Sequence, residues 1–236
     1  MASSLTSDLL KAVRLDDAAS IAALLNSAPR TKIHEKRALK MLIESVERDK
    51  LAATQALLSW GVDANAEYGN DLLTPLVQAA RKNSIEAARL LLGAGADASK
   101  EGSCGWTPLH EARTREMATL LLDAGADIEA IGSRNSAPLW WACVREWDEV
   151  ALLLIERGAN IEPPDCSPLC GAIYSARERL VETLLARGAR VLREAPDPPF
   201  VFDALDWARR GNPMNTPVVN ARIVEMVEEA AARQGS

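Results

Sequence analysis

The chain has 236 residues, of which 48% are hydrophobic and 4% are aromatic, and its formal net charge is −6. This apolar content allows a sizeable core and argues against a disordered chain, whereas the acidic balance argues against a nucleic-acid-binding face, which needs clustered basic residues. No apolar run reaches the length of a membrane span, and the amino-terminal residues lack the basic start and apolar stretch of a signal peptide.

The cysteines indicate the compartment. Four occur, at Cys104, Cys143, Cys166 and Cys170, and none of them forms the Cys-x-x-Cys pair of a zinc or redox site. We therefore expect free thiols, no metal site and a reducing compartment, either the cytoplasm or the nucleus.

The predicted elements, taken from the amino terminus, begin with a helical hairpin near residues 4–28 that would cap one end of a repeat array. Five units follow, and each ends in a glycine that comes a few residues after a pair of large aliphatic side chains. These glycines are Gly61, Gly95, Gly125, Gly158 and Gly188, spaced 30 to 34 residues apart. In the tail we expect an inner helix over 203–208, a loop over 211–217 and a last outer helix over 223–227.

A second phrase, Thr-Pro-Leu or a variant of it, recurs at the start of the middle units. It occurs as Thr74-Pro75-Leu76, Thr107-Pro108-Leu109, Ala137-Pro138-Leu139 and Ser167-Pro168-Leu169. A Thr or Ser hydroxyl caps free backbone N–H groups at a helix start, and Pro at the first helical position gives up a donor that has no partner there. The closing glycine accepts the left-handed conformation that stops the second helix. Each unit is therefore predicted to be a helical hairpin that is stabilised by stacking on its neighbours.

These two phrases resemble those of the ankyrin-repeat family. The run from Thr107 to Ala112, Thr-Pro-Leu-His-Glu-Ala, is close to the family's Thr-Pro-Leu-His-x-Ala signature, and the period near 33 is similar as well. The resemblance implies an all-α ankyrin-repeat solenoid of stacked helix-turn-helix units with β-turn fingers, about seven units with degenerate caps included. We expect a single domain over 1–236, with an amino-terminal capping unit (1–33), five repeats (34–195) and a carboxy-terminal capping unit (196–236).

The third full unit departs from the pattern. From Thr107 to Gly125 is 18 positions, against 21 from Thr74 to Gly95, so three positions are missing where residues 113–116 join its helices. We expect a shortened inner helix or a shortened turn in this unit.

The resemblance also implies that ligands bind the concave face, which is formed by finger tips and inner helices. Common contact positions in the family are the residue before the Thr-Pro-Leu phrase and the residues near the end of the inner helix. The predicted partner-binding residues are Asp71, Arg81, Lys82, Trp106, Glu111, Arg134, Trp141, Arg145 and Tyr174.

Four tryptophans in two adjacent units have two interpretations. Trp106 lies on a finger, where the pattern needs no core residue, and Trp141 follows Trp140, which takes the place of the motif's His. Because Trp is enriched among interface anchors, we expect Trp106 and Trp141 to form an exposed aromatic patch. The other interpretation is that Trp140 and Trp147 fill space left by the shortened unit.

Catalytic patterns are not visible in the sequence. His34 lies in a short basic stretch, and His110 belongs to the repeat motif, where the family uses it to hydrogen-bond backbone between repeats. No Gly-rich phosphate loop and no cluster of metal-ligating residues occurs. We interpret Glu111 as a surface carboxylate, with a role as general acid or base as the alternative, and we expect no cofactor.

The sequence therefore predicts a protein–protein interaction module that binds a partner through its concave groove and finger tips, with no nucleic acid and no membrane. The alternative is a small-molecule-binding protein or an atypical enzyme, with a small apolar ligand in a Trp-lined pocket of the same groove. The irregular third unit motivates this alternative, because a stack that binds only a protein needs no break in register.

Overall fold

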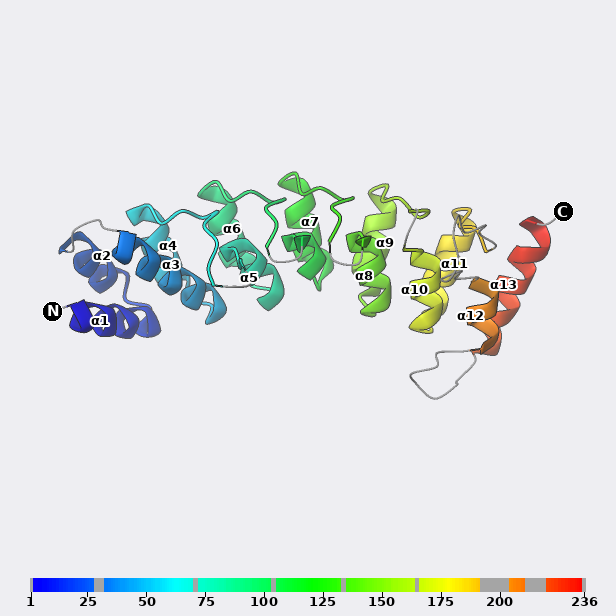
Figure 1. Cartoon of the computed structure of the whole chain (residues 1–236), viewed down its shortest axis with the longest axis horizontal. Coiled ribbons are helices and arrows are strands. Elements are labelled where there is room, and N and C mark those ends of the chain that lie inside the picture. Colours follow the sequence, from blue (N-terminus) through cyan, green and yellow to red (C-terminus); the bar gives the residue numbers. More distant parts are fainter. Residues whose placement is uncertain are drawn as a thin grey trace. The chain divides into compact units, whose positions relative to one another are not determined.

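The part of the chain that the structure describes folds almost entirely into helices. The computed structural model describes residues 2–27, 32–69, 72–102, 105–132, 135–163, 166–191, 204–210 and 220–234. These residues contain no extended strand, although two isolated β-bridges pair Tyr68 with Leu73 and Gly132 with Ser136. The helices, drawn in Figure 1, group into two compact units, Met1–Ala130 and Ile131–Ser236.

The described residues of the first unit form four helical hairpins. Their helices are α1 (Ala2–Leu15), α2 (Ala18–Ser27), α3 (Lys32–Glu47), α4 (Leu51–Trp60), α5 (Pro75–Lys82), α6 (Ile85–Gly93), η2 (Pro108–Glu111) and α7 (Arg115–Asp123). The elements α1, α3, α5 and η2 pack side by side as an inner row, and α2, α4, α6 and α7 pack as an outer row. Each hairpin contributes one helix to each row.

The second unit has the same construction, with three hairpins in its described residues. Its helices are α8 (Pro138–Val144), α9 (Asp148–Glu156), α10 (Pro168–Tyr174), α11 (Glu178–Ala186), α12 (Ala204–Arg210) and α13 (Ala221–Gln234). The inner row is α8, α10 and α12, and the outer row is α9, α11 and α13. An all-α fold of stacked helical hairpins is thus confirmed within each unit.

The predicted caps are present at two inner helices. The Thr74 hydroxyl accepts a hydrogen bond from the Val77 N–H at 3.2 Å, and the Ser167 hydroxyl accepts one from the Cys170 N–H at 3.4 Å. In both helices a proline follows in the first turn. Helix α8 begins after Ala137 and has no side-chain cap. The phrase therefore marks a helix start even where its first residue lacks a hydroxyl.

The glycines that end the outer helices have the predicted left-handed conformation. Gly95 has a φ of 86°, and beyond it the Ala96 N–H donates to the Leu91 carbonyl at 2.9 Å. The same bond recurs after Gly61, whose φ is 95°. Because a side chain is strained in this conformation, the glycine fixes where the outer helix stops.

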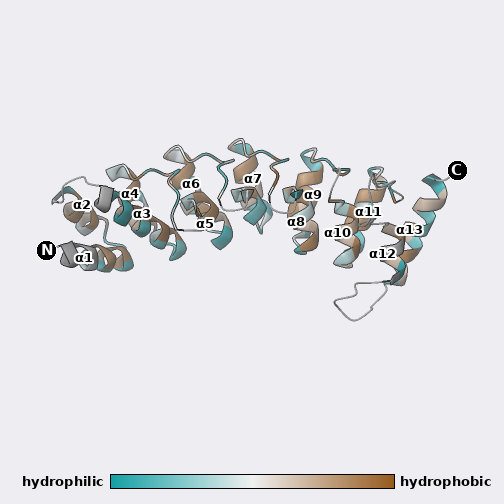
Figure 2. Cartoon of the chain, in the orientation of Figure 1, coloured by the Kyte–Doolittle hydropathy of each residue, from teal (hydrophilic) through white to brown (hydrophobic). Residues whose placement is uncertain are grey.

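The core of each unit lies between its two rows of helices. The first members of the predicted aliphatic pairs are fully buried: Leu57, Leu91, Leu121, Leu154 and Leu184. The small inner-row residues predicted to allow close helix packing are buried too: Ala79, Ala112, Ala142 and Ala172. Figure 2 shows hydrophobic residues along α6, α9 and α11. Burial of each large aliphatic side chain stabilises the fold by about 1.5–3 kcal/mol. Stacking therefore supplies the apolar burial that a single hairpin cannot achieve by itself.

The shortened unit has a single turn of 3₁₀ helix, η2, where its neighbours have an α-helix. The chain then runs directly to Thr114, whose hydroxyl accepts a hydrogen bond from the Met117 N–H at 3.3 Å and so caps α7. The prediction of a shortened inner helix is confirmed, and its outer helix keeps the full length of its neighbours.

Finger side chains tie consecutive repeats of the first unit together. The Asn65 amide donates to the Gly95 carbonyl at 2.9 Å, and its Oδ1 accepts from the Asp97 N–H at 2.7 Å. One repeat later, the Ser99 hydroxyl accepts from the Asp127 N–H at 2.8 Å. These bonds satisfy backbone groups at the base of each finger and fix the register of the stack.

Both predicted capping units contain helical hairpins. Helices α1 and α2 cover the hairpin expected near 4–28, and α12 and α13 cover the two helices expected in the tail. Gln234 links the last helix to the preceding repeat, because its amide donates to the Ala189 carbonyl and its Oε1 accepts from the Val191 N–H, both at 2.9 Å. The loop expected over 211–217 lies outside the described residues, and the assignment of the chain to a single domain stays a prediction.

Candidate partner-binding surface

In the first unit, Trp106 lies against the histidine of the repeat motif. The ring centroids of Trp106 and His110 are 5.5 Å apart in an edge-to-face arrangement. His110 is buried, and its Nδ1 accepts a hydrogen bond from the Thr107 N–H at 3.3 Å. This bond lies within one repeat, so the bond between repeats that the resemblance implies for His110 stays a prediction, and Trp106 is half-buried at the finger.

The predicted charged residues of the first unit form two ion pairs on the inner row. Arg81 Nε lies 4.0 Å from Glu111 Oε1, and Lys82 Nζ lies 3.3 Å from Glu47 Oε1. The Arg81 side chain is 55% exposed and the Glu111 side chain is 12% exposed. Glu111 therefore faces a cation on the neighbouring inner helix and is mostly buried, unlike the surface carboxylate expected from the sequence, and its alternative role as a general acid or base stays a prediction.

In the second unit, one arginine lies against two tryptophans. The Arg145 guanidinium carbon is 5.1 Å from the Trp141 ring centroid and 5.7 Å from the Trp147 ring centroid. The Trp140 and Trp141 rings meet edge to face at 5.0 Å. All three tryptophans are half-buried and Arg145 is exposed. We call Trp140, Trp141, Arg145 and Trp147 the Arg–Trp cluster.

Tyr174 ends α10, the inner helix that packs on α8, and is half-buried. The two helices approach closely, because a Cβ added at Gly171 would lie 3.2 Å from Val144 Cγ2. The Ser175 hydroxyl also donates to the Val144 carbonyl at 3.1 Å. The ends of α8 and α10, which carry Arg145 and Tyr174, are thereby held next to each other.

The predicted residues do not all come together in one described site. Trp106, Arg81, Lys82 and Glu111 belong to the first unit, and Trp141, Arg145 and Tyr174 belong to the second. Asp71 and Arg134 lie outside the described residues. The idea that Trp140 and Trp147 fill space beside the shortened repeat stays a prediction.

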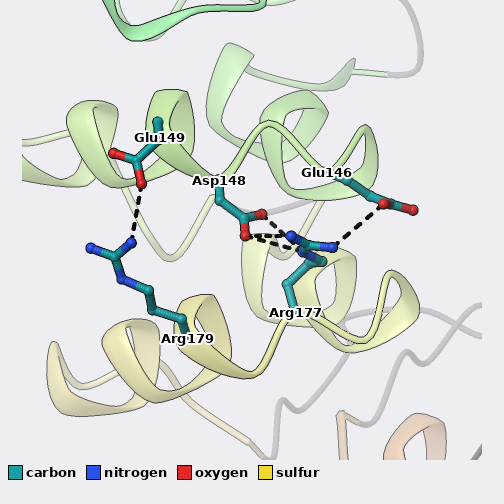
Figure 3. Close-up of polar contacts among 5 residues, drawn as sticks. All are labelled: Glu146, Asp148, Glu149, Arg177 and Arg179. Atoms are coloured by element: carbon teal, nitrogen blue, oxygen red, sulfur yellow. Dashed lines mark hydrogen bonds and ion pairs between the residues drawn. The ribbon is translucent and has the colours of Figure 1, made fainter.

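Sequence reasoning missed an ion-pair network on the outer side of the second unit, drawn in Figure 3. Arg177 binds Asp148 with an Nη2–Oδ2 distance of 2.6 Å, and it also approaches Glu146 at 3.5 Å. Arg179 pairs with Glu149 at 3.1 Å. The signal was available, because Glu149 and Arg179 are one repeat apart, 30 residues, with opposite charges.

Cys143 is a fully buried thiol in the second unit. Burial, with a smaller contribution from the charge of Asp148, raises the pKa of the Cys143 thiol well above its usual value, so Cys143 is protonated at neutral pH and a poor nucleophile. No group of three or more His, Cys, Asp or Glu side chains suitable for a metal ion occurs in the described part of the chain. Within the same residues, no helix combines the length and the apolar character needed to cross a membrane.

Comparison with known proteins supports the family resemblance. Residues 42–132 match the family model described as ankyrin repeats (3 copies). No curated protein matches the chain. The matched segment runs through the hairpins that end at Gly61, Gly95 and Gly125, including the shortened unit. The repeat period and the hairpin geometry agree with this match, and residues 42–132 are similar to ankyrin repeats.

Proposed function

We propose that this chain is a non-enzymatic module that binds a segment of a partner protein through its inner helices and fingers. Ankyrin repeats are generally protein–protein interaction modules. The proposal adds one contact point in each unit, Trp106 in the first and the Arg–Trp cluster in the second. The acidic net charge supports a protein partner, and the free thiol of Cys143 supports a reducing compartment, the cytoplasm or the nucleus.

The observation that carries the proposal is the incomplete burial of the tryptophans on the fingers and inner helices. Trp106, Trp140 and Trp141 are half-buried, next to Leu109 and Leu139 of the Thr-Pro-Leu phrases, which are buried. The core is therefore completed by the aliphatic residues, and the large aromatic side chains keep surface available for contact. Trp is one of the residue types enriched among the strong anchors of protein interfaces.

The test compares the full-length chain with a Trp106→Ala/Trp141→Ala variant in affinity capture from cell extract, followed by titration of each captured protein in purified form. Trp60→Ala is the matched control, because Trp60 is also half-buried but ends the outer helix α4. A genuine partner should bind the wild type and the Trp60→Ala control alike. Its binding to the double variant should be weaker by at least about 2 kcal/mol, roughly thirtyfold in Kd.

Thermal unfolding of all three proteins establishes that the variants are folded. If every captured protein binds the folded double variant as tightly as the wild type, the inner surface is not the binding site and the proposal is wrong. If Trp60→Ala alone abolishes binding, the outer side of the stack is the interface instead.

A further inference from the structure

Arg145 is a cation without a carboxylate partner in the described part of the chain. Its guanidinium contacts are with the Trp141 and Trp147 rings, at 5.1 and 5.7 Å. The side chain is nevertheless exposed. A guanidinium has five N–H donors, and contact with aromatic faces leaves those donors unsatisfied by protein acceptors.

The absence of an ion pair at Arg145 is not explained by a shortage of nearby acids. Glu146 follows it directly and Asp148 is three residues on, yet both carboxylates are directed to Arg177 (Figure 3). Arg179, on the outer helix α11, has Glu149 of α9. Arg177 and Arg179 pair with carboxylates, whereas Arg145, at the end of the inner helix α8, contacts aromatic rings.

The backbone keeps Arg145 apart from its acidic neighbours. Its N–H donates to the Trp141 carbonyl at 2.9 Å at the end of α8, and Glu146 then takes a left-handed conformation with a φ of 62°. This turn sends the Glu146 side chain toward the outer network while Arg145 stays with Trp141. A cation at a helix carboxy terminus is also favoured by the helix dipole.

We infer that the Arg–Trp cluster recognises an acidic segment of the partner protein, in which a carboxylate binds Arg145 and an adjacent apolar side chain packs on Trp140 and Trp141. This inference rests on the proposed function and specifies the chemistry of the partner. The planar guanidinium matches a carboxylate in bidentate geometry. Stacking on two rings restricts the rotamers of Arg145 before binding, so less side-chain freedom is lost when the complex forms.

The test uses the full-length chain as bait for a random dodecapeptide library displayed on phage, with Trp106→Ala/Trp141→Ala and Arg145→Gln as counter-selection baits. Peptides that need the tryptophans should be enriched in Asp or Glu next to a Leu, Phe or Trp. A synthetic peptide from that set should bind Arg145→Gln at least about tenfold more weakly than the wild type. Arg179→Gln, which changes an exposed arginine of the outer network, should leave its affinity unchanged.

A charge exchange distinguishes direct recognition from a general effect of charge. Arg145→Glu should reject the acidic peptide and should gain affinity for the same peptide with its essential Glu replaced by Lys. Arg145→Lys should restore only part of the wild-type affinity, because an ammonium lacks the planar fork. Thermal unfolding shows whether each variant is folded.

The outcomes separate the two proposals. Peptides that need the tryptophans but have no acidic residue, or that bind Arg145→Gln as well as the wild type, would refute the acidic-partner inference and leave the proposed function standing. A library in which no peptide depends on the tryptophans would refute both.

Discussion

Arg177 binds both carboxylate oxygens of Asp148: Nε donates to Oδ1 at 3.0 Å, and Nη2 donates to Oδ2 at 2.6 Å. The residues are 29 positions apart, at equivalent turns of consecutive hairpins. The hydrogen bond to Asp148 is the largest cause of a raised pKa at Arg177. Because the Asp148 side chain is 23% exposed and that of Arg177 is 34% exposed, water competes for this pair less than at a surface ion pair.

Removal of this bidentate contact should destabilise the second unit. We predict that Asp148→Asn lowers the free energy of unfolding by about 1–2 kcal/mol, since the amide keeps one acceptor oxygen but loses the charge and the second acceptor, so that Glu146, at the longer distance, is the remaining carboxylate of this contact. Urea unfolding followed by far-UV circular dichroism measures the change. Glu149→Gln is the matched control: the Glu149–Arg179 pair is 60% and 67% exposed, so its loss should cost less than about 0.5 kcal/mol. Equal effects of the two variants would contradict the prediction.

Ala176 connects α10 to α11 in a conformation that disfavours its side chain. Its φ is 53°, in the left-handed region that costs an L-residue about 1–2 kcal/mol. We predict that Ala176→Gly raises the free energy of unfolding by about 0.5–1 kcal/mol, the relief of strain being partly offset by the greater freedom of glycine in the unfolded chain. Ala172→Gly in the buried middle of α10 should have the opposite sign. Thermal and urea unfolding of both variants test this, and a destabilised Ala176→Gly would refute it.

Asn65 both donates to and accepts from the finger base of the next repeat, so a change that removes the donor but keeps an acceptor is informative. We predict that Asn65→Asp costs about 1 kcal/mol of stability, because the Gly95 carbonyl loses its amide donor and a carboxylate joins Asp63 and Asp97 at the same turns. Asn65→Ser should cost less. At the equivalent position one repeat later, the Ser99 hydroxyl accepts a hydrogen bond from the Asp127 N–H. The measurement is the urea midpoint at constant slope, and equal stabilities of Asn65→Asp and the wild type would rule out a role for the donor.

The helical hairpins were predictable because their signals are local. Gly95 must accept a left-handed backbone, and Thr74 must cap a helix, whatever surrounds them, and the spacing of such residues then gives the repeat. Even the loss of helix in the third unit followed from counting positions between Thr107 and Gly125. This agreement between local preference and overall fold is expected of a solenoid, in which each repeat contacts only its neighbours.

The contacts between side chains of neighbouring repeats were not predictable in the same way. Asp16, Asp49 and Asn83 occupy left-handed turn positions and are residue types that tolerate them, but Glu146 and Ala176 take the same conformation without such a signal. The choice of Arg177 rather than Arg145 as the partner of Asp148 depends on that turn at Glu146. Sequence reasoning therefore found Arg145 and Trp141 as candidates but not the arrangement that separates Arg145 from the adjacent acids.

The buried thiol of Cys143 should limit stability at high pH. Desolvation raises the pKa of Cys143 in the folded chain, whereas in the unfolded chain the thiol ionises near its ordinary value of about 8.5. Below that pH both states keep the proton and stability is unaffected. Above it only the unfolded state loses the proton, so the free energy of unfolding should fall by up to about 1.4 kcal/mol per pH unit.

Urea unfolding under reducing conditions from pH 7 to pH 10 tests this for the wild type, Cys143→Ala and Cys166→Ala. At pH 7 we expect Cys143→Ala to be less stable than the wild type by about 1 kcal/mol, since the fully buried sulfur leaves a small cavity. The difference should shrink as the pH rises, because the variant has no thiol to ionise at this position. Cys166, which is half-buried, serves as the control, and Cys166→Ala should follow the wild-type pH dependence. Parallel curves for the wild type and Cys143→Ala would show that burial at α8 does not perturb this thiol.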